Sequence, residues 1–230
     1  AMLLLIFSRL WQVVFERGAA GDTRASDMLW YLAATEWIVL SLPLIHLDIE
    51  EDIRNGNVAT RLPRPISYLG ARLAEAAGAW LLRSTTLAAA GVVLALGFGG
   101  AWPSDPWGLA WLVPLAVLGS LLGMLWLALI GLAAFWVYDA SPLYWVWQKL
   151  SFTFGGLMLP LAFYPAWLRN IAEWTPFAPM MHGPAQMVFG PDLDVALGVL
   201  LRLVVWIAVS GALLAFVYRR ALRALDVGGG

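Results

Sequence analysis

Long runs of apolar residues, separated by short polar stretches, recur along the whole chain. A helix that crosses the hydrocarbon core of a bilayer, roughly 30 Å thick, needs about 20 mainly apolar residues. Runs such as 109–137 are apolar on all faces and do not alternate with polar residues, which favours helices over the strands of a membrane barrel. The pattern predicts a single all-α transmembrane domain over residues 1–230, with about six spans at 2–15, 28–47, 80–98, 109–137, 145–162 and 195–217.

Composition agrees with this pattern. Hydrophobic residues make up 61% of the chain and charged residues 13%, and the mean hydropathy is +0.77, far from the balance of a soluble domain. A net charge of -1 argues against general affinity for nucleic acid, and the absence of cysteine excludes disulfides and thiolate metal sites.

The basic residues predict the orientation, because Lys and Arg gather in cytoplasmic loops of membrane proteins. One side holds Arg54, Arg61, Arg64, Arg72, Lys149, Arg219, Arg220 and Arg223, whereas the other holds Arg17, Arg24 and Arg169. We therefore expect a multi-pass protein of a cell membrane, in bacteria the inner membrane, with the charged segment 48–79 and the C-terminus in the cytoplasm.

The cytoplasmic segment 48–79 is predicted to be structured. Ile49 and Ile53 share one face of two amphipathic turns, and Gly56 is suited to end them. Prolines at 63 and 65 prevent a continuous helix, after which residues 67–79 have the spacing of a helix at the membrane interface. On these residues alone, a solvated loop that only fixes topology is an equal alternative.

A family resemblance favours a functional role for this segment. The run Asp52-Ile-Arg-Asn-Gly-Asn-Val-Ala-Thr-Arg-Leu-Pro-Arg-Pro65, after the second apolar run, resembles the signature of permeases of type-two ABC exporters. The resemblance implies a coupling helix between spans two and three that docks into a separate ATPase subunit. The interface residues it implies are Glu50, Glu51, Asp52, Ile53, Arg54, Gly56, Arg64 and Pro65.

The resemblance also implies the partners. Such permeases work with ABC ATPase subunits and with a second copy of themselves or a homologous permease, within the lipid bilayer. The chain has no glycine-rich phosphate loop that ends in Lys-Ser or Lys-Thr, since its one lysine is Lys149. We therefore expect no cofactor in this chain, with ATP and Mg²⁺ bound by the partner subunit.

The extracytoplasmic segment 163–194, with the residues just before it, is rich in proline and aromatic residues. Repeated prolines argue against one continuous span and favour short re-entrant or interfacial helices, which could line the outer end of a substrate path. An external amphipathic cap is the alternative. The residues singled out are Pro160, Pro165, Trp167, Pro176 and Pro179.

Three charged residues lie within predicted spans at similar depth: Arg9, Glu36 and Arg202. A charge at a helix centre costs about 2.5 to 3.5 kcal/mol on insertion scales, so an Arg9–Glu36 pair between the first two spans is expected. Structural pairing is preferred over substrate contact, and Arg202 is the better candidate for an anionic headgroup.

The remaining features are interpreted as structural. His46 and His182 have no acidic neighbours at metal-ligand spacing, so no metal site is predicted. The tryptophans cluster near predicted span ends and are interpreted as an aromatic belt and not as a ligand cage. The favoured function is a permease of an ATP-driven exporter that forms the translocation path, and the alternatives are a membrane-embedded lipid-modifying enzyme or an ion-coupled secondary transporter.

Overall fold

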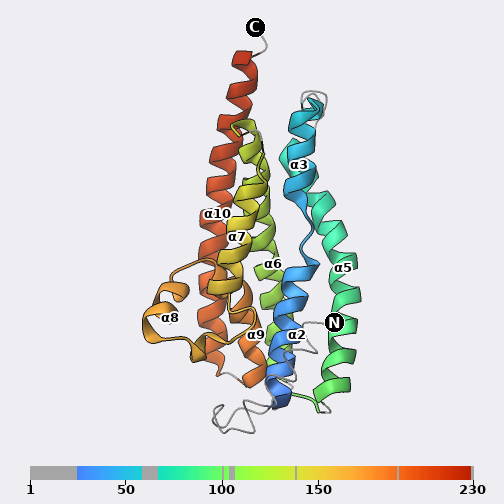
Figure 1. Cartoon of the computed structure of the whole chain (residues 1–230), viewed down its shortest axis with the longest axis vertical. Helices are drawn as coiled ribbons and strands as arrows, with labels where there is room; N and C mark the ends of the chain where they lie inside the picture. Colours follow the sequence, from blue (N-terminus) through green and yellow to red (C-terminus); the bar gives the residue numbers. More distant parts are fainter. Residues whose placement is uncertain are drawn as a thin grey trace.

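The computed structural model describes residues 25–58, 67–99, 101–103, 107–137, 139–190 and 192–228, and every element in these ranges is helical. Long helices run roughly parallel or antiparallel along one axis, and shorter ones fill the end opposite the C-terminus (Figure 1). The elements are α2 (Ala25–Ser41), α3 (Ile45–Arg54), α5 (Tyr68–Gly99), α6 (Gly108–Leu132), η1 (Ala133–Phe135), α7 (Ser141–Phe154), η2 (Leu161–Phe163), α8 (Ala166–Glu173), η3 (Ala178–His182), α9 (Gly183–Ala185), η4 (Gln186–Phe189) and α10 (Leu193–Gly228).

Four helical stretches in the described part of the chain are long and apolar enough to cross a membrane: Ser26–Arg54, Tyr68–Phe98, Gly108–Phe135 and Leu193–Arg223. The prediction of a helical, multi-spanning protein is therefore supported, but the count of six spans is not. The predicted span 2–15 lies outside the described residues. The predicted span 145–162 corresponds to α7, which has 14 residues and ends at Phe154, where Gly155 and Gly156 follow.

The segment 48–79 differs from the predicted loop. α3 starts at Ile45, inside the predicted second span, and α5 runs without a break from Tyr68 to Gly99. The helix expected along the interface over 67–79 is thus the beginning of α5. No proline interrupts the sequence from 68 to 99, so nothing ends the helix before it enters the apolar run.

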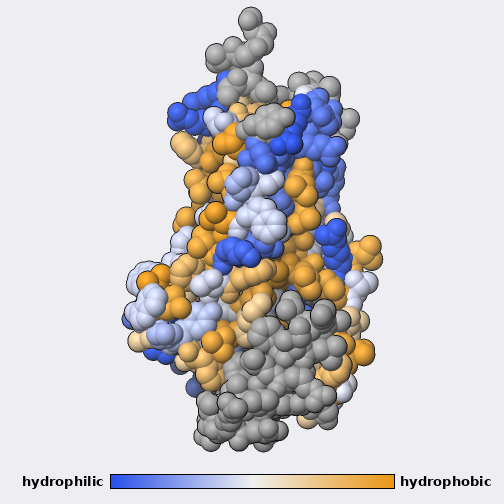
Figure 2. All heavy atoms as spheres, viewed as in Figure 1, coloured by the Kyte–Doolittle hydropathy of each residue, from blue (hydrophilic) through white to orange (hydrophobic). Residues whose placement is uncertain are grey.

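The helix α6 lies at the centre of the bundle. In its most apolar stretch 72% of residues are buried, as in the stretch Ser26–Arg54, compared with 11% in α5 and 22% in α10. Large apolar side chains of α5 and α10, such as Leu82 and Leu201, are exposed on the outside. Figure 2 shows apolar residues along the sides of the molecule and hydrophilic residues gathered at the end where α3 stops.

Two elements that do not span the structure, α3 and the helical segment 177–189, pack on α6 at glycines. A Cβ added at Gly119 would lie 2.3 Å from the carbonyl oxygen of Met180. One added at Gly131 would lie 2.9 Å from the Cβ of Ile49 and 3.0 Å from the Cα of His46. Real Cβ contacts are not this short, so both packings depend on the absence of a side chain on α6.

Replacing Gly119 by alanine should therefore destabilise the protein. The new methyl group must displace the backbone at Met180, at a cost of about 1 to 3 kcal/mol. Gly78→Ala on α5 is the matched control, because nothing lies within 4 Å of its Cβ position. Thermal unfolding in detergent should show a melting temperature several degrees lower for Gly119→Ala and unchanged or raised for Gly78→Ala; equal values would contradict this packing.

Candidate functional site

The first part of the site is α3, which a break in the chain separates from α2. Pro43 lacks an amide hydrogen and stands between the last residue of α2, Ser41, and the first of α3, Ile45. The buried face of α3 packs against α6 at Gly131. α3 ends at Arg54, and Gly56 has a φ of +70°, the left-handed conformation that its glycine was predicted to supply.

An ion pair joins α3 to α5. The Asp52 carboxylate accepts hydrogen bonds from the Tyr68 hydroxyl at 2.9 Å and from Arg72 Nε at 2.8 Å, both on Oδ2. The Arg72 Nη1 also donates to Glu75 Oε2 at 2.7 Å. Only 4% of the Asp52 side chain and 14% of that of Arg72 is exposed. A buried carboxylate with charged and neutral donors is strongly held, so the N-terminal end of α5 is fixed to α3.

A second set of charges joins α3 to the start of α7. Arg54 Nη2 lies 2.6 Å from Glu50 Oε1 and 3.9 Å from Asp139 Oδ1. Asp139 in turn accepts a hydrogen bond of 2.9 Å from the amide of Ser141, the first residue of α7. Hydrogen bonding by the Ser141 hydroxyl and amide, with a smaller effect of the nearby Arg54, holds the pKa of the exposed Asp139 carboxyl below its usual value. The contact is more exposed and longer than the one to α5, and therefore weaker.

The face of α3 toward α7 carries two polar atoms without partners. His46 stacks on Tyr144 with ring centroids 4.2 Å apart, and its Nδ1 is buried. Glu50 Oε2 is also buried, and neither atom has a hydrogen-bond partner in the described part of the chain. An unpaired buried polar group costs about 1 to 3 kcal/mol, so this interface is less stable than a fully bonded one.

The structure divides the predicted interface residues into two groups. Glu50 and Asp52 are buried and hold α3 in place. The outer face of α3 and its end carry exposed Glu51, Arg54 and Gly56, with Ile53 half-buried. Arg64 and Pro65 lie outside the described residues.

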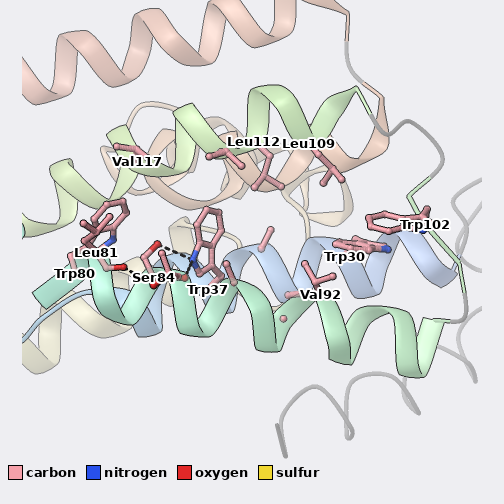
Figure 3. A pocket seen from close by; sticks show the side chains of 16 residues that line it. Trp30, Trp37, Trp80, Leu81, Ser84, Val92, Trp102, Leu109, Leu112 and Val117 are labelled. Atoms are coloured by element: carbon pink, nitrogen blue, oxygen red, sulfur yellow. Dashed lines mark hydrogen bonds between the residues drawn. The ribbon is translucent and has the colours of Figure 1, made fainter. Parts of the chain in front are cut away.

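The second part of the site is a groove between α2, α5 and α6, with a volume of about 480 Å³. Figure 3 shows Trp30 and Trp102 at one end of it and Trp37 and Trp80 toward the other. Trp30 and Trp102 stack with centroids 5.6 Å apart, and Trp37 Nε1 donates to the Ser84 carbonyl at 2.9 Å. The groove is suited to an apolar or aromatic group, since its lining contains no charged side chain.

The third part is the broken backbone after α7. The Tyr31 hydroxyl of α2 donates to the carbonyl of Gly156 at 2.6 Å, and Thr35 Oγ1 donates to that of Leu157 at 2.8 Å. Gly156 has a φ of +67°. A backbone interrupted among membrane helices needs partners for its carbonyl groups, and α2 supplies them from one face.

His182 completes this cluster. Its Nδ1 lies 3.0 Å from the Tyr31 hydroxyl oxygen. Since the one hydroxyl proton of Tyr31 is directed to Gly156, the Nδ1 of His182 must carry a hydrogen and donate it. Burial lowers the pKa of His182 to about 4, so the ring is neutral at neutral pH and Nε2 is an acceptor.

The segment predicted to be extracytoplasmic, 163–194 with the residues just before it, is called the outer segment here and has an exposed and a buried part. Pro160 and Pro165 immediately precede η2 and α8, where they start short helices, and 65% of Trp167 is exposed. Pro176 and Pro179 are buried at the beginning of the segment 177–189 beside α6. Short helices were predicted here, and the structure contains two: α8 on the outside and the buried helical segment 177–189 beside α6.

Comparison with known proteins gives the family. The model of the ABC-2 family transporter protein matches residues 10–229, almost the entire chain. The chain belongs to this family. It is thus a membrane-spanning permease subunit of an ABC transporter. A search of curated proteins found no match.

Membership of the ABC-2 family favours a transport subunit over the lipid-modifying enzyme and the secondary carrier. Family membership does not assign a role to the three charged residues Arg9, Glu36 and Arg202. Arg9 lies outside the described residues, so its pairing with Glu36 stays a prediction. Glu36 is half-buried on α2, Arg202 is exposed on α10, and the described residues contain no ion pair between them.

Several site residues were not found from the sequence. Tyr31 and Thr35 are one helical turn apart, a spacing that could have indicated a polar face on α2, but their carbonyl partners are more than 120 residues away. The interpretation of the tryptophans as an aromatic belt was incomplete, because four of them line one groove. Trp30, Ala33, Ala34 and Trp37 have the spacing of one helix face, and this was the available signal.

Removal of the Asp52 charge should destabilise the permease. Asp52→Asn leaves the partly buried Arg72 without its main counter-charge, which costs about 3 to 5 kcal/mol. Glu51→Gln, one residue away and exposed, should change stability by less than about 0.5 kcal/mol. Chemical unfolding in detergent measures both, and a similar stability of the two variants would refute the clamp between α3 and α5.

The Tyr31 hydroxyl should also contribute to stability. Tyr31→Phe leaves the Gly156 carbonyl and His182 Nδ1 without their shared partner, for a loss of about 1 to 3 kcal/mol. Tyr164→Phe is the control, because that hydroxyl donates to the Thr153 carbonyl at an exposed site where water can replace it. We expect a lower melting temperature only for Tyr31→Phe, and an equal shift in the two variants would argue against a special role for the buried bond.

Proposed function

We propose that this permease serves an ATP-driven exporter and that α3, with the residues after it up to 65, transmits the movement of separate ATPase subunits to the membrane helices. ATP and Mg²⁺ belong to the ATPase partner, and this chain contributes no cofactor. The observation that carries the proposal is the position of α3, whose end is exposed while its buried side chains connect it to α5 and α6.

The contacts of α3 give a route for such a movement. A displacement of its end is carried to α5 by the buried Asp52–Arg72 pair and to the start of α7 through Arg54 and Asp139. α5 forms one wall of the tryptophan-lined groove, with α2 and α6 as the others. A shift of α5 against α6 therefore changes the width of a groove that is suited to apolar or aromatic groups.

Two buried atoms without hydrogen-bond partners, on the face of α3 toward α7, favour two positions of α3. The observed position leaves His46 Nδ1 and Glu50 Oε2 buried without partners. A second position in which these atoms are hydrated or hydrogen-bonded recovers about 1 to 3 kcal/mol each. This difference is small enough for a docked ATPase to shift the balance between the positions.

The assembly we propose is a pair of permeases, either two copies of this chain or this chain and a homologous one, together with ATPase subunits. One helix bundle of this size can supply only half of a translocation path. The exposed apolar faces of α5 and α10 are available for the partner permease and for lipid. The end of α3 and the C-terminus lie at the same end of the molecule (Figure 1), which we assign to the cytoplasm of a bacterial cell.

Charge reversal at the end of α3 tests the coupling. In the complex reconstituted with its ATPase, Glu51→Lys should reduce both the ATPase retained during purification and its ATP turnover by roughly tenfold, as for a central interface residue. Asp48→Lys is the control, because Asp48 is also exposed on α3 but lies nearly one turn further from its end. Unchanged turnover in the Glu51 variant would contradict the proposal.

A further inference from the structure

Arg202 is a charged residue on the outer surface of an apolar helix. It belongs to the candidate span Leu193–Arg223, and 65% of Leu201 and 51% of Val205 beside it are exposed. Its guanidinium has no ion pair or hydrogen bond among the described residues. An arginine in such a place is costly unless it meets polar groups.

The helix gives this side chain room to approach the outer segment. Helical side chains lean toward the N-terminus, so Arg202 passes the position one turn earlier, which is Gly198. Nothing lies within 4 Å of a Cβ placed at Gly198. The guanidinium can therefore extend along α10 toward the end where α10 begins.

The Arg202 side chain lines a small cavity beside α10. Its volume is about 70 Å³, and residues of α10 and of the outer segment line it. A cavity needs about 10 to 15 Å³ of such space to hold one water, so this one has room for a polar group of several heavy atoms and not for a whole lipid. The polar side chains that line it are Glu173, His182, Gln186 and Arg202.

These side chains favour a ligand with both charges. An anion attracted by Arg202 would be opposed by Glu173, and a cation attracted by Glu173 would be opposed by Arg202. The carboxylate and the guanidinium do not pair with each other in this structure, although both line the cavity. His182, whose Nδ1 faces Tyr31, adds the acceptor Nε2, and an acceptor is suited to an ammonium group.

The neighbouring helix α8 indicates the depth of the cavity. Its exposed apolar residues are Trp167 and Ile171, one turn apart, and Trp174 follows directly after its end with 85% of its surface exposed. A short helix with an exposed tryptophan face is typical of the interface between headgroups and acyl chains. Glu173, at the end of α8, lies at the same level.

We propose that this cavity binds a zwitterionic headgroup of the phosphoethanolamine type, with the phosphate against Arg202 and the ammonium group against Glu173 and His182. The acyl chains of such a lipid lie along the exposed apolar face of α10 beside Leu201 and Val205. The site is separate from the coupling contacts of α3, and it does not depend on the proposed coupling to an ATPase.

Native mass spectrometry of the delipidated, detergent-solubilised permease tests this site. Phosphatidylethanolamine, phosphatidylglycerol and phosphatidylcholine with the same acyl chains are titrated separately. The wild type should bind phosphatidylethanolamine roughly tenfold more tightly than phosphatidylglycerol, because one charge pair distinguishes them. Phosphatidylcholine, whose ammonium group has no N–H donors, should bind more weakly than phosphatidylethanolamine.

Substitutions assign the two charges. Glu173→Gln should remove the preference for phosphatidylethanolamine over phosphatidylglycerol, and Arg202→Gln should weaken both lipids by roughly tenfold. Arg169→Gln is the matched control, because Arg169 is on α8 but does not line the cavity. Equal binding of the two lipids by the wild type, or an unchanged preference in Glu173→Gln, would overturn the proposal. Both changed side chains are on the surface, and melting temperatures recorded in parallel show whether each variant is folded.

Soluble glycerophosphoethanolamine distinguishes the source of the headgroup. If it competes with the lipid at millimolar concentration, the site recognises the headgroup by itself and accepts a soluble ligand. If the lipid remains bound, the site is one for a membrane lipid, held by its acyl chains as well. The Arg202 and Glu173 variants must alter whichever binding is seen.

Discussion

The close approach of two short helical elements to α6 organises this permease. In a bilayer, apolar side chains gain little by leaving lipid for protein, so helices associate through close contact and through polar groups that need partners. Gly119 and Gly131 permit this contact, because the backbone at Met180 and the side of α3 at Ile49 and His46 come nearer than any side chain would allow. Polar contacts with neighbouring helices help to hold these elements next to α6, since Asp52 of α3 is bonded to α5 and His182 of the segment 177–189 is bonded to α2.

This arrangement places the polar interactions at the interruptions. Where the chain breaks after α7, Tyr31 and Thr35 of α2 bond the carbonyl groups at 156 and 157. Where it breaks around Pro43, α3 is held through Asp52 and Arg72 to α5. The contact of α3 with α7 is weaker, since it includes two buried atoms without partners in the described residues. α3 is thus firmly attached on one side and loosely on the other, which is suited to an element that moves together with α5.

The sequence predicted the elements better than their contacts. Long apolar runs located the long helices, Gly56 marked the end of α3, and the repeated prolines indicated short helices before α10. The end of α7 at Phe154 was not predicted, because the apolar run continues past the two glycines to 162. The pairing of Asp52 with Arg72 and the presence of Glu173 and Arg202 in the lining of one cavity both depend on tertiary packing. Neither follows from local spacing.

Site-specific crosslinking measures directly whether the end of α3 meets the ATPase. The chain has no cysteine, so Asn55→Cys, at the exposed end of α3, introduces a single reactive thiol. Trp174→Cys is the control, because it is 85% exposed near α8, at the opposite end of the molecule (Figure 1). With a short thiol-to-amine reagent in native membranes, the account predicts a permease–ATPase product from Asn55→Cys and none from Trp174→Cys. The reverse pattern, or no product from Asn55→Cys in a complex that hydrolyses ATP, would contradict it.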